Sequence, residues 1–263
     1  MYTGFCQVTN EELADFYEGK TDLNLYPNQF VLTEDNKILK YKNGSLITVK
    51  AKQVKNNYMG KVKSLNTEQT MALDLLFDDS IKLVVLSGKA GCGKTYLSTQ
   101  VGLQYITDRS YDNIFFIRNN VEITKGLGAL PGEKLDKLKP YMASVVDQVG
   151  GWNVMYDLLE RRMIEAEALG YIQGRSIADS WIIADEAQNL TKSQMKMLIT
   201  RVSHNSKIVL CGDIEQVANG SFEGENNGIK HLVECFKGYS IFGTVMLQKG
   251  ERSELAELAS VLL

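Results

Sequence analysis

The part of the sequence best suited to chemistry is a glycine-rich loop that ends in lysine and threonine. Residues 88–95 read GKAGCGKT and fit the pattern G-x-x-x-x-G-K-[ST], with an apolar run before them and a helix-like stretch after them. Glycines let successive backbone N–H groups surround a phosphate, and the following helix points its positive end at the same anion. We therefore expect ATP to bind here, with Lys94 on the β- and γ-phosphates and the Thr95 hydroxyl on Mg²⁺. The expected nucleotide-contacting residues of the loop are Gly88, Lys89, Ala90, Gly91, Cys92, Gly93, Lys94, Thr95 and Tyr96.

Two adjacent acids form the second chemical feature. In WIIADEAQN, residues 181–189, Asp185 and Glu186 follow an apolar run at the point where a buried strand would end. One carboxylate at this point can complete the Mg²⁺ site, and the next can orient the water that attacks the γ-phosphate. We expect Asp185 and Glu186 to have these two roles, with a solvated strand end as the alternative. A positioned base for water favours hydrolysis over kinase chemistry, which needs a second pocket for an acceptor.

A third polar group follows the next apolar run, in CGDIEQ at residues 211–216. A side chain at this position could contact the γ-phosphate and respond to its loss. Asp213 and Gln216 are the candidates for this sensing role. The dipeptide Gly-Asp after a strand is equally typical of an ordinary turn, which is the alternative.

The four cysteines stand far apart in the sequence and form no C-x-x-C pair. Neither a zinc ribbon nor a disulfide framework is therefore indicated, and reduced thiols are expected. Cys92 lies inside the glycine-rich loop, near a helix N-terminus and Lys94. These surroundings lower a thiol pKa, so oxidation of Cys92 is a hypothetical means of blocking nucleotide binding.

These groups need a sheet to position them, and the sequence predicts one. Six apolar, strand-like runs are separated by helical stretches, at residues 82–86, 113–117, 163–169, 180–184, 207–211 and 240–247. This alternation predicts an α/β fold in which helices cover both faces of a parallel sheet.

The first 63 residues predict a small β-rich module with a basic linker. A helix is expected at residues 11–17 and strands at 29–32, 37–41 and 46–49, with Asn43-Gly44 as a hairpin turn. Asn66 is expected to cap the helix that follows and runs to about Phe77. We therefore expect a module at residues 1–63 and a nucleotide-binding domain at residues 64–263.

Length and composition exclude several classes of protein. With 263 residues, of which 44% are hydrophobic and 23% charged, the chain is neither disordered nor a low-complexity repeat. The chain has two histidines, which argues against a histidine-based hydrolase or metal site. No stretch reaches 18 apolar residues, so we expect no membrane contact and a cytoplasmic location.

The net charge of −3 conceals a strongly basic segment. Residues 1–35 hold seven acids and one lysine, whereas residues 36–67 hold eight lysines and no acid. These lysines are interleaved with Tyr41 and Tyr58, a combination that suits a single-stranded nucleic acid through charge and base stacking. They are equally suited to pairing with the acidic remainder of the chain.

Together these motifs resemble those of the PhoH-like ATPases, relatives of the superfamily 1 helicase core. The resemblance rests on NTEQTMALDLL (66–76), the glycine-rich loop, IRNNVEITKGLGALPG (117–132), YIQGRSIADS (171–180), DEAQNLTKSQMKMLITR (185–201) and GDIEQ (212–216). The resemblance covers residues 66–263. It implies a single RecA-like domain that assembles into a hexameric ring. The name of the family is associated with phosphate starvation. The compact form is similar to bacteriophage versions, which would be expected in the host cytoplasm. The length implies that the PIN-type nuclease domain of longer members is absent.

The resemblance also implies roles for individual residues. Gln69 matches a glutamine that reads the adenine edge, and it also fits the helix start described above. Arg252 matches a basic residue that acts on a neighbouring subunit's γ-phosphate, with an ordinary surface arginine as the alternative. The loop after the second strand lies on the nucleic-acid side of helicase-like cores, although its small net charge also suits a solvated loop. The candidate nucleic-acid contacts are Arg118, Lys125, Lys134, Lys137, Lys139 and Arg175, of which Arg175 is also a candidate for a subunit interface.

We therefore expect a Mg²⁺-dependent ATPase whose hydrolysis is coupled to RNA or single-stranded nucleic acid in an oligomeric ring. The alternative is a nucleotide-controlled scaffold, in which ATP organises a ring that binds a protein partner without acting on nucleic acid. Glu186 and the order of the motifs disfavour a small-molecule kinase. Superfamily 1 helicases use two RecA-like domains, so a neighbouring subunit would have to supply the second half of any translocating site.

Overall fold

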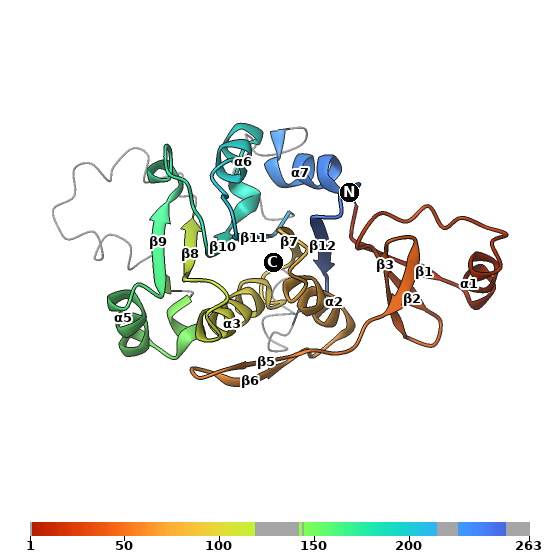
Figure 1. The fold of residues 1–263 in the computed structure, drawn as a ribbon, viewed down its shortest axis with the longest axis horizontal. Helices are drawn as coiled ribbons and strands as arrows, with labels where there is room; N and C mark the ends of the chain where they lie inside the picture. The colour runs from red at the N-terminus through yellow and green to blue at the C-terminus, as the bar shows by residue number, and fades with distance from the viewer. Residues whose placement is uncertain (1, 119–141, 144, 215–225, 251–263) are drawn as a thin grey trace, which may run out of the picture.

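A six-stranded parallel sheet forms the centre of the protein in the computed structural model, which describes residues 2–118, 142–143, 145–214 and 226–250. The strand order is β12-β7-β11-β10-β8-β9, and every neighbouring pair runs parallel (Figure 1). The strands are β7 (Leu83–Gly88), β8 (Asn113–Arg118), β9 (Ile164–Ala168), β10 (Ser180–Asp185), β11 (Lys207–Gly212) and β12 (Phe242–Leu247). All six predicted apolar runs form strands, and the predicted RecA-like α/β class is confirmed.

Helices cover both faces of this sheet, because its strands are apolar on both sides. Along β7, Val84 and Leu86 pack toward α2 and α3, whereas Leu83 and Val85 pack toward α6 and α7 (Figure 1). The helices of the first face are α2 (Thr67–Leu76), α3 (Lys94–Thr107) and α5 (Trp152–Glu160), and those of the second are α6 (Lys192–Ile199) and α7 (Gly228–Phe236). Within the described residues, every helix is too short or too polar to cross a lipid bilayer.

The strand order decides which loops meet at the site. β11 lies between β7 and β10, so the carboxyl ends of these three strands lie side by side. In open parallel sheets, ligands bind outside these carboxyl ends. At the end of β7, Gly88 has a φ of 137°, and a side chain there would lie 1.9 Å from the carbonyl oxygen of Leu247 on β12. A glycine is therefore required where the glycine-rich loop leaves the sheet.

A second, four-stranded sheet lies at the N-terminal end of the molecule, in the order β1-β2-β3-β4 (Figure 1). Its elements are β1 (Phe5–Val8), α1 (Asn10–Tyr17), β2 (Phe30–Thr33), β3 (Ile38–Lys42) and β4 (Ser45–Thr48). The expected helix and three antiparallel strands are confirmed, and Asn43 and Gly44 form the turn between β3 and β4, with φ values of 52° and 80°. β1 was not predicted, because it pairs in parallel with β2, far along the chain, and has no local turn signal.

The basic segment continues into a two-stranded hairpin that sequence reasoning missed, formed by β5 (Gln53–Asn56) and β6 (Gly60–Lys63). This hairpin packs on α3 and does not join the N-terminal sheet. Val54 and Val62 enter the core of the main domain, and the Asn56 side-chain amide donates a hydrogen bond to Gln100 Oε1 at 2.8 Å. Its signal in the sequence was the alternation of lysine and valine in KVK, which two-residue periodicity could have identified.

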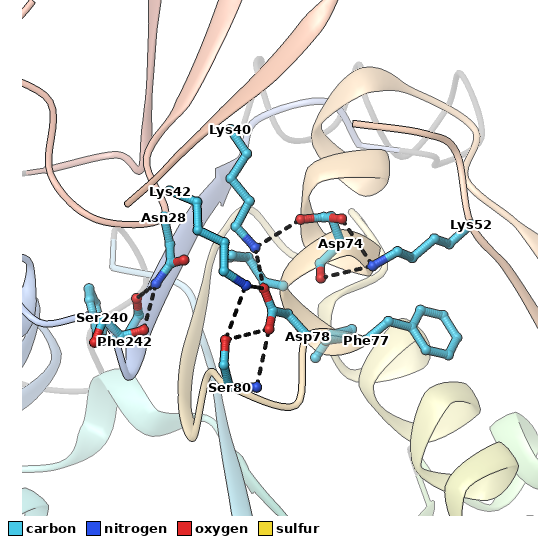
Figure 2. A network of polar contacts seen from close by, with 12 residues as sticks. Asn28, Lys40, Lys42, Lys52, Asp74, Phe77, Asp78, Ser80, Ser240 and Phe242 are labelled. Atoms are coloured by element: carbon cyan, nitrogen blue, oxygen red, sulfur yellow. Dashed lines mark hydrogen bonds and ion pairs between the residues drawn. The ribbon is translucent and has the colours of Figure 1, made fainter. Parts of the chain in front are cut away.

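Figure 2 shows how the N-terminal sheet is attached to the main domain. Lys40 is 6% exposed and its ammonium lies 3.0 Å from Asp74 Oδ2 and 2.9 Å from Asp78 Oδ2. Lys42 pairs with the same Asp78 oxygen at 2.9 Å, and Lys52 pairs with Asp74 at 3.0 Å. The pairing interpretation of the basic segment is therefore confirmed for these three lysines. Nearby, the Asn28 amide donates hydrogen bonds to the backbone carbonyls of residues 240 and 242, which hold the sheet against β12.

Candidate nucleotide-binding site

A pocket of about 640 Å³ opens at the carboxyl ends of β7, β10 and β11. Its lining combines the glycine-rich loop, the two acids after β10 and the start of α2, and one strand of the β5–β6 hairpin closes the side. The described residues that line it are Met59, Lys61, Val62, Lys63, Leu65, Gln69, Ala90, Gly91, Gly93, Lys94, Thr95, Tyr96, Leu97, Gln148, Asp185, Glu186, Cys211, Gly212 and Asp213. Of the residues predicted to bind nucleotide, Gly88, Lys89 and Cys92 do not line this cavity, and the others do, namely Gln69, Ala90, Gly91, Gly93, Lys94, Thr95 and Tyr96.

The glycine-rich loop curls around the ammonium group of Lys94. Lys94 Nζ donates hydrogen bonds to the carbonyl oxygens of Gly88 at 2.6 Å and Lys89 at 2.7 Å. Gly91 and Gly93 have φ values of 85° and 91°, a region that glycine adopts at little cost. Helix α3 begins directly after this turn, so its positive N-terminal end faces the pocket. The loop therefore presents a lysine, a helix terminus and backbone N–H groups, the features that bind phosphate.

The Thr95 hydroxyl donates a hydrogen bond to Asp185 Oδ1 at 2.8 Å, joining the start of α3 to the end of β10. Burial raises the pKa of the Asp185 carboxyl, and the hydrogen bond from Thr95 partly offsets this effect. A hydroxyl and a carboxylate in contact are the hard oxygen ligands that Mg²⁺ prefers, and Mg²⁺ completes its shell with phosphate and water. The residues present therefore fit a magnesium ion, whose positive charge would also offset the cost of burying the Asp185 carboxylate.

Glu186 has a left-handed backbone conformation, with a φ of 53°, and its side chain contacts two of the residues that the structure describes. Arg118 lies 3.7 Å from Glu186 Oε1, and the Gln188 amide donates a hydrogen bond to Oε2 at 2.7 Å. Sequence reasoning missed Gln188, which is 1% exposed and belongs to the 3₁₀ turn η3 (Ala187–Asn189). The sequence feature that could have identified Gln188 is an amide side chain two residues after the proposed catalytic acid Glu186, in the same polar turn.

Asp213 follows β11 and reaches the glycine-rich loop. Its Oδ2 accepts a hydrogen bond from the Ala90 N–H at 3.2 Å, and its own N–H donates to Gln188 Oε1 at 3.0 Å. Asp213 therefore contacts the glycine-rich loop, and its role as a γ-phosphate sensor stays a prediction. Several expected site residues lie outside the described residues, namely Gln216, Arg252, Lys125, Lys134, Lys137 and Lys139.

The side chain of Gln69 is buried between the start of α2 and the glycine-rich loop. Asn66 caps this helix as expected, accepting a hydrogen bond from the Gln69 N–H at 2.9 Å. The Gln69 side-chain Oε1 accepts from the Leu65 N–H at 2.8 Å, and Nε2 donates to the Cys92 carbonyl at 3.2 Å. Each amide atom can form one further hydrogen bond, so the two contacts orient the amide without using up its capacity.

The expected reactivity of Cys92 is wrong in direction. Cys92 is fully buried, and this burial raises the pKa of its thiol, although Lys94 opposes the effect. The helix terminus and the lysine are present as expected, but loss of water around the sulfur outweighs both. Cys92 is therefore a packing residue of the loop and not an activated thiol.

The two arginines proposed to contact nucleic acid already have acidic neighbours. Arg118 ends β8 and pairs with Glu186 inside the site. Arg175 lies 3.4 Å from Glu167 and 3.6 Å from Glu165, with its guanidinium 5.1 Å from the centre of the Phe115 ring. Both arginines are partly exposed, so contact with phosphate at either position would compete with an internal ion pair.

The family described as PhoH-like protein matches residues 61–260 of this chain. Protein PhoH2 of Bacillus subtilis (strain 168) is 39% identical over 287 residues, covering 100% of this chain and 64% of that protein. Protein PhoH2 of Mycolicibacterium smegmatis is 35% identical over 207 residues, covering 77% of this chain and 47% of that protein. The chain therefore spans less than two thirds of the length of each of these relatives.

Two solved helicase structures are similar at a lower level. Pif1 from Bacteroides sp. in complex with ADP-AlF4 is 16% identical, covers 76% of this chain and 46% of that chain, and has a TM-score of 0.36. Pif1 helicase from Candida albicans is 14% identical, covers 72% and 41%, and has a TM-score of 0.37. At this level of similarity the chemistry of the site has to be read from its own geometry.

Proposed function

Because the chain belongs to the PhoH-like protein family, we propose that it is a Mg²⁺-dependent ATPase that couples hydrolysis to RNA or single-stranded nucleic acid in an oligomeric ring. The observation that carries the catalytic part is the 2.8 Å contact between the Thr95 hydroxyl and the Asp185 carboxylate beside the glycine-rich loop. A lysine, a hydroxyl and two carboxylates around one phosphate site are the groups that nucleoside triphosphate hydrolysis requires.

In this proposal, phosphate oxygens replace the protein's own groups in the glycine-rich loop. Lys94 exchanges its bonds to the carbonyls of Gly88 and Lys89 for bonds to the β- and γ-phosphates. The carboxylate of Asp213 leaves the Ala90 N–H, which then donates to a phosphate oxygen. Thr95 and Asp185 would hold Mg²⁺, which neutralises part of the phosphate charge.

The remaining polar groups orient the attacking water and the adenine base of the nucleotide. Glu186 accepts a hydrogen bond from the attacking water and holds it toward the γ-phosphate. At the other end, the second donor and second lone pair of the Gln69 amide match the donor and acceptor on the adenine edge. Gln216 as the γ-phosphate sensor and Arg252 as a trans-acting arginine complete the proposed set. Arg118 and the lysines of the loop that follows it are the proposed nucleic-acid contacts.

The test is the rate of ATP turnover with and without single-stranded RNA and DNA, together with the mass of the assembled particle. We expect Mg²⁺-dependent turnover that oligonucleotides stimulate and that salt suppresses, because phosphate contacts release counterions. Lys94→Ala should abolish nucleotide binding or turnover, since it removes the charge at the centre of the loop. ATP-dependent assembly without stimulation by oligonucleotides would favour a scaffold, and absence of Mg²⁺-dependent turnover would overturn the proposal.

A further inference from the structure

The fold separates six of the eight lysines of the basic segment into two groups. Lys40, Lys42 and Lys52 point inward and are paired with Asp74 and Asp78, as Figure 2 shows. The second group lies on the β5–β6 hairpin, is exposed to solvent and has no ion pair within the described residues. Its members are Lys55, Lys61 and Lys63. The positive charge of this second group therefore remains available to a partner.

Strand geometry places the three lysines on one face of the hairpin. Val54 is paired with Val62 and both are buried, so their neighbours in each strand point outward. Lys55 stands directly opposite Lys61, and Lys63 follows two residues later on the same face. Like charges directly opposite one another destabilise a strand pair. The arrangement therefore works against folding and is explained by an anionic ligand.

We propose that the outer face of the β5–β6 hairpin binds the phosphate backbone of a single-stranded nucleic acid. This inference rests on the proposed function and assigns its nucleic acid to a surface. Residues two apart on a strand are separated by about 6.7 Å, a distance close to that between successive phosphates of an extended strand. Lys61 and Lys63 therefore match two neighbouring phosphates, and Lys55 lies opposite the first of them.

Aromatic side chains lie beside the tip of the hairpin and suit the bases of the same ligand. The tip points toward α5 (Figure 1), and the Tyr58 hydroxyl lies 3.9 Å from the sulfur of Met163, which follows that helix and directly precedes β9. On α5, the rings of Trp152 and Tyr156 lie 5.6 Å apart, and Tyr156 is 38% exposed. Lysines beside partly exposed aromatic rings are the combination used for single strands, in which bases are unpaired and can stack. An acidic protein partner would need the lysines but not the rings.

The hairpin is coupled to the nucleotide site by direct contacts. Gln104 Oε1 accepts a hydrogen bond from the Lys55 N–H at 2.8 Å, and Gln100 holds the Asn56 side chain. Both glutamines belong to α3, the helix that begins at Lys94 of the glycine-rich loop. Lys61 and Lys63 also border the nucleotide pocket. A nucleic-acid strand bound on the hairpin would therefore lie beside bound ATP. The phosphates of ATP are the alternative anionic ligand for Lys61 and Lys63.

The experiment compares two triple variants of the full chain. The first carries Lys55→Gln, Lys61→Gln and Lys63→Gln, and the matched control carries the same change at Lys50, Lys82 and Lys196, which are exposed lysines outside the two strands of the hairpin. Fluorescence anisotropy measures the affinity for labelled single-stranded RNA and DNA at several salt concentrations. A fluorescent ATP analogue measures nucleotide affinity in the same proteins, and thermal unfolding confirms that both are folded.

We expect the hairpin variant to lose at least tenfold in oligonucleotide affinity, and the slope of log affinity against log salt to fall by about 2. Nucleotide affinity should fall by a smaller factor, and Lys55→Gln alone, which lies outside the pocket, should weaken oligonucleotide binding. The inference is overturned if the hairpin variant binds oligonucleotides as tightly as the control does, or if its affinity for nucleotide falls as much as its affinity for oligonucleotides. It is also overturned if the unaltered protein binds no oligonucleotide. Binding of oligonucleotides without ATP turnover would instead contradict the proposed function and leave the hairpin surface in place.

Discussion

The side-chain amide of Gln188 donates a hydrogen bond to the carboxylate of Glu186, with 2.7 Å between Nε2 and Oε2. The same amide accepts from the Asp213 N–H, and Asp213 accepts from the Ala90 N–H in the glycine-rich loop. A side chain on Gly212 would lie 2.9 Å from Gln188 Oε1, so glycine leaves room for this amide. A continuous set of hydrogen bonds therefore joins the glycine-rich loop to the proposed base for water.

The first prediction concerns Gln188 as a positioning residue. Gln188→Ala removes the donor that orients the Glu186 carboxylate, so we expect kcat for ATP hydrolysis to fall about tenfold, with a much smaller change in KM. Steady-state kinetics measures both constants. Gln194→Ala, which alters a helix cap on α6 outside the pocket, is the control and should leave kcat unchanged. Equal loss in the two variants would show a general effect on folding and remove Gln188 from this role.

The second prediction separates nucleotide binding from hydrolysis at Glu186. Glu186→Gln keeps the size of the side chain but removes its basicity, so we expect ATP to bind while turnover falls by a factor of about 10² to 10⁴. Binding of a fluorescent ATP analogue and release of phosphate are measured on the same preparation. Normal turnover in this variant would assign the orientation of water to another group.

The third prediction follows from the buried position of Cys92. Because its thiol pKa is raised, the reactive thiolate is scarce at neutral pH, and we expect mild peroxide treatment to leave ATP affinity unchanged. Cys235 is exposed and serves as the internal control, since a thiol-specific alkylating reagent should modify it first. Mass spectrometry of the two peptides locates the modification. Preferential labelling of Cys92 would show that the loop opens in solution.

The fourth prediction concerns acid stability of the contact between the N-terminal sheet and α2. Burial acts to raise the pKa of Asp78, but hydrogen bonds from Ser80, Lys40 and Lys42 outweigh it, and the net shift is downward. A carboxyl whose pKa is lower in the folded state contributes stability above its unfolded pKa, near 3.8, and loses it as the pH falls below that value. We therefore expect Asp78→Asn to lower the melting temperature at pH 7. The same variant should show a smaller further decrease in melting temperature between about pH 4 and pH 2.

Thermal unfolding followed by circular dichroism across this pH range measures the effect. Asp35→Asn, which disrupts an exposed pair with Lys37, is the control and should change the melting temperature little because solvent screens that pair. Lys40→Met offers an independent test at pH 7. It removes a cation that is 6% exposed and contacts two carboxylates, so we expect a loss of about 3 kcal/mol. Stability unchanged by both Asp78→Asn and Lys40→Met would contradict the attachment in Figure 2.

Features with a local pattern could be predicted from the sequence. The glycine-rich loop, the six core strands and the Asn43-Gly44 turn each depend on residues that are close together in the chain. Features that depend on distant partners could not. Lys207 is an example, since it is fully buried and its ammonium donates hydrogen bonds to the carbonyls of Leu75, Leu76 and Asp78 at the end of α2. Nothing near Lys207 in the sequence indicates that it would cap a helix so far away.

The sequence by itself determined which residues form the proposed phosphate site, because phosphate binding requires glycines, a lysine and a threonine at fixed spacing within one turn. It also determined the family and the presence of a basic segment. Only the tertiary structure decided which lysines of that segment are neutralised, since Asp74 and Asp78 reach Lys40 through packing between separate elements. It likewise decided that Gln188 contacts Glu186 and that Cys92 is buried. Charge and reactivity depend on what surrounds a side chain, and those surroundings come from parts of the chain that only folding brings together.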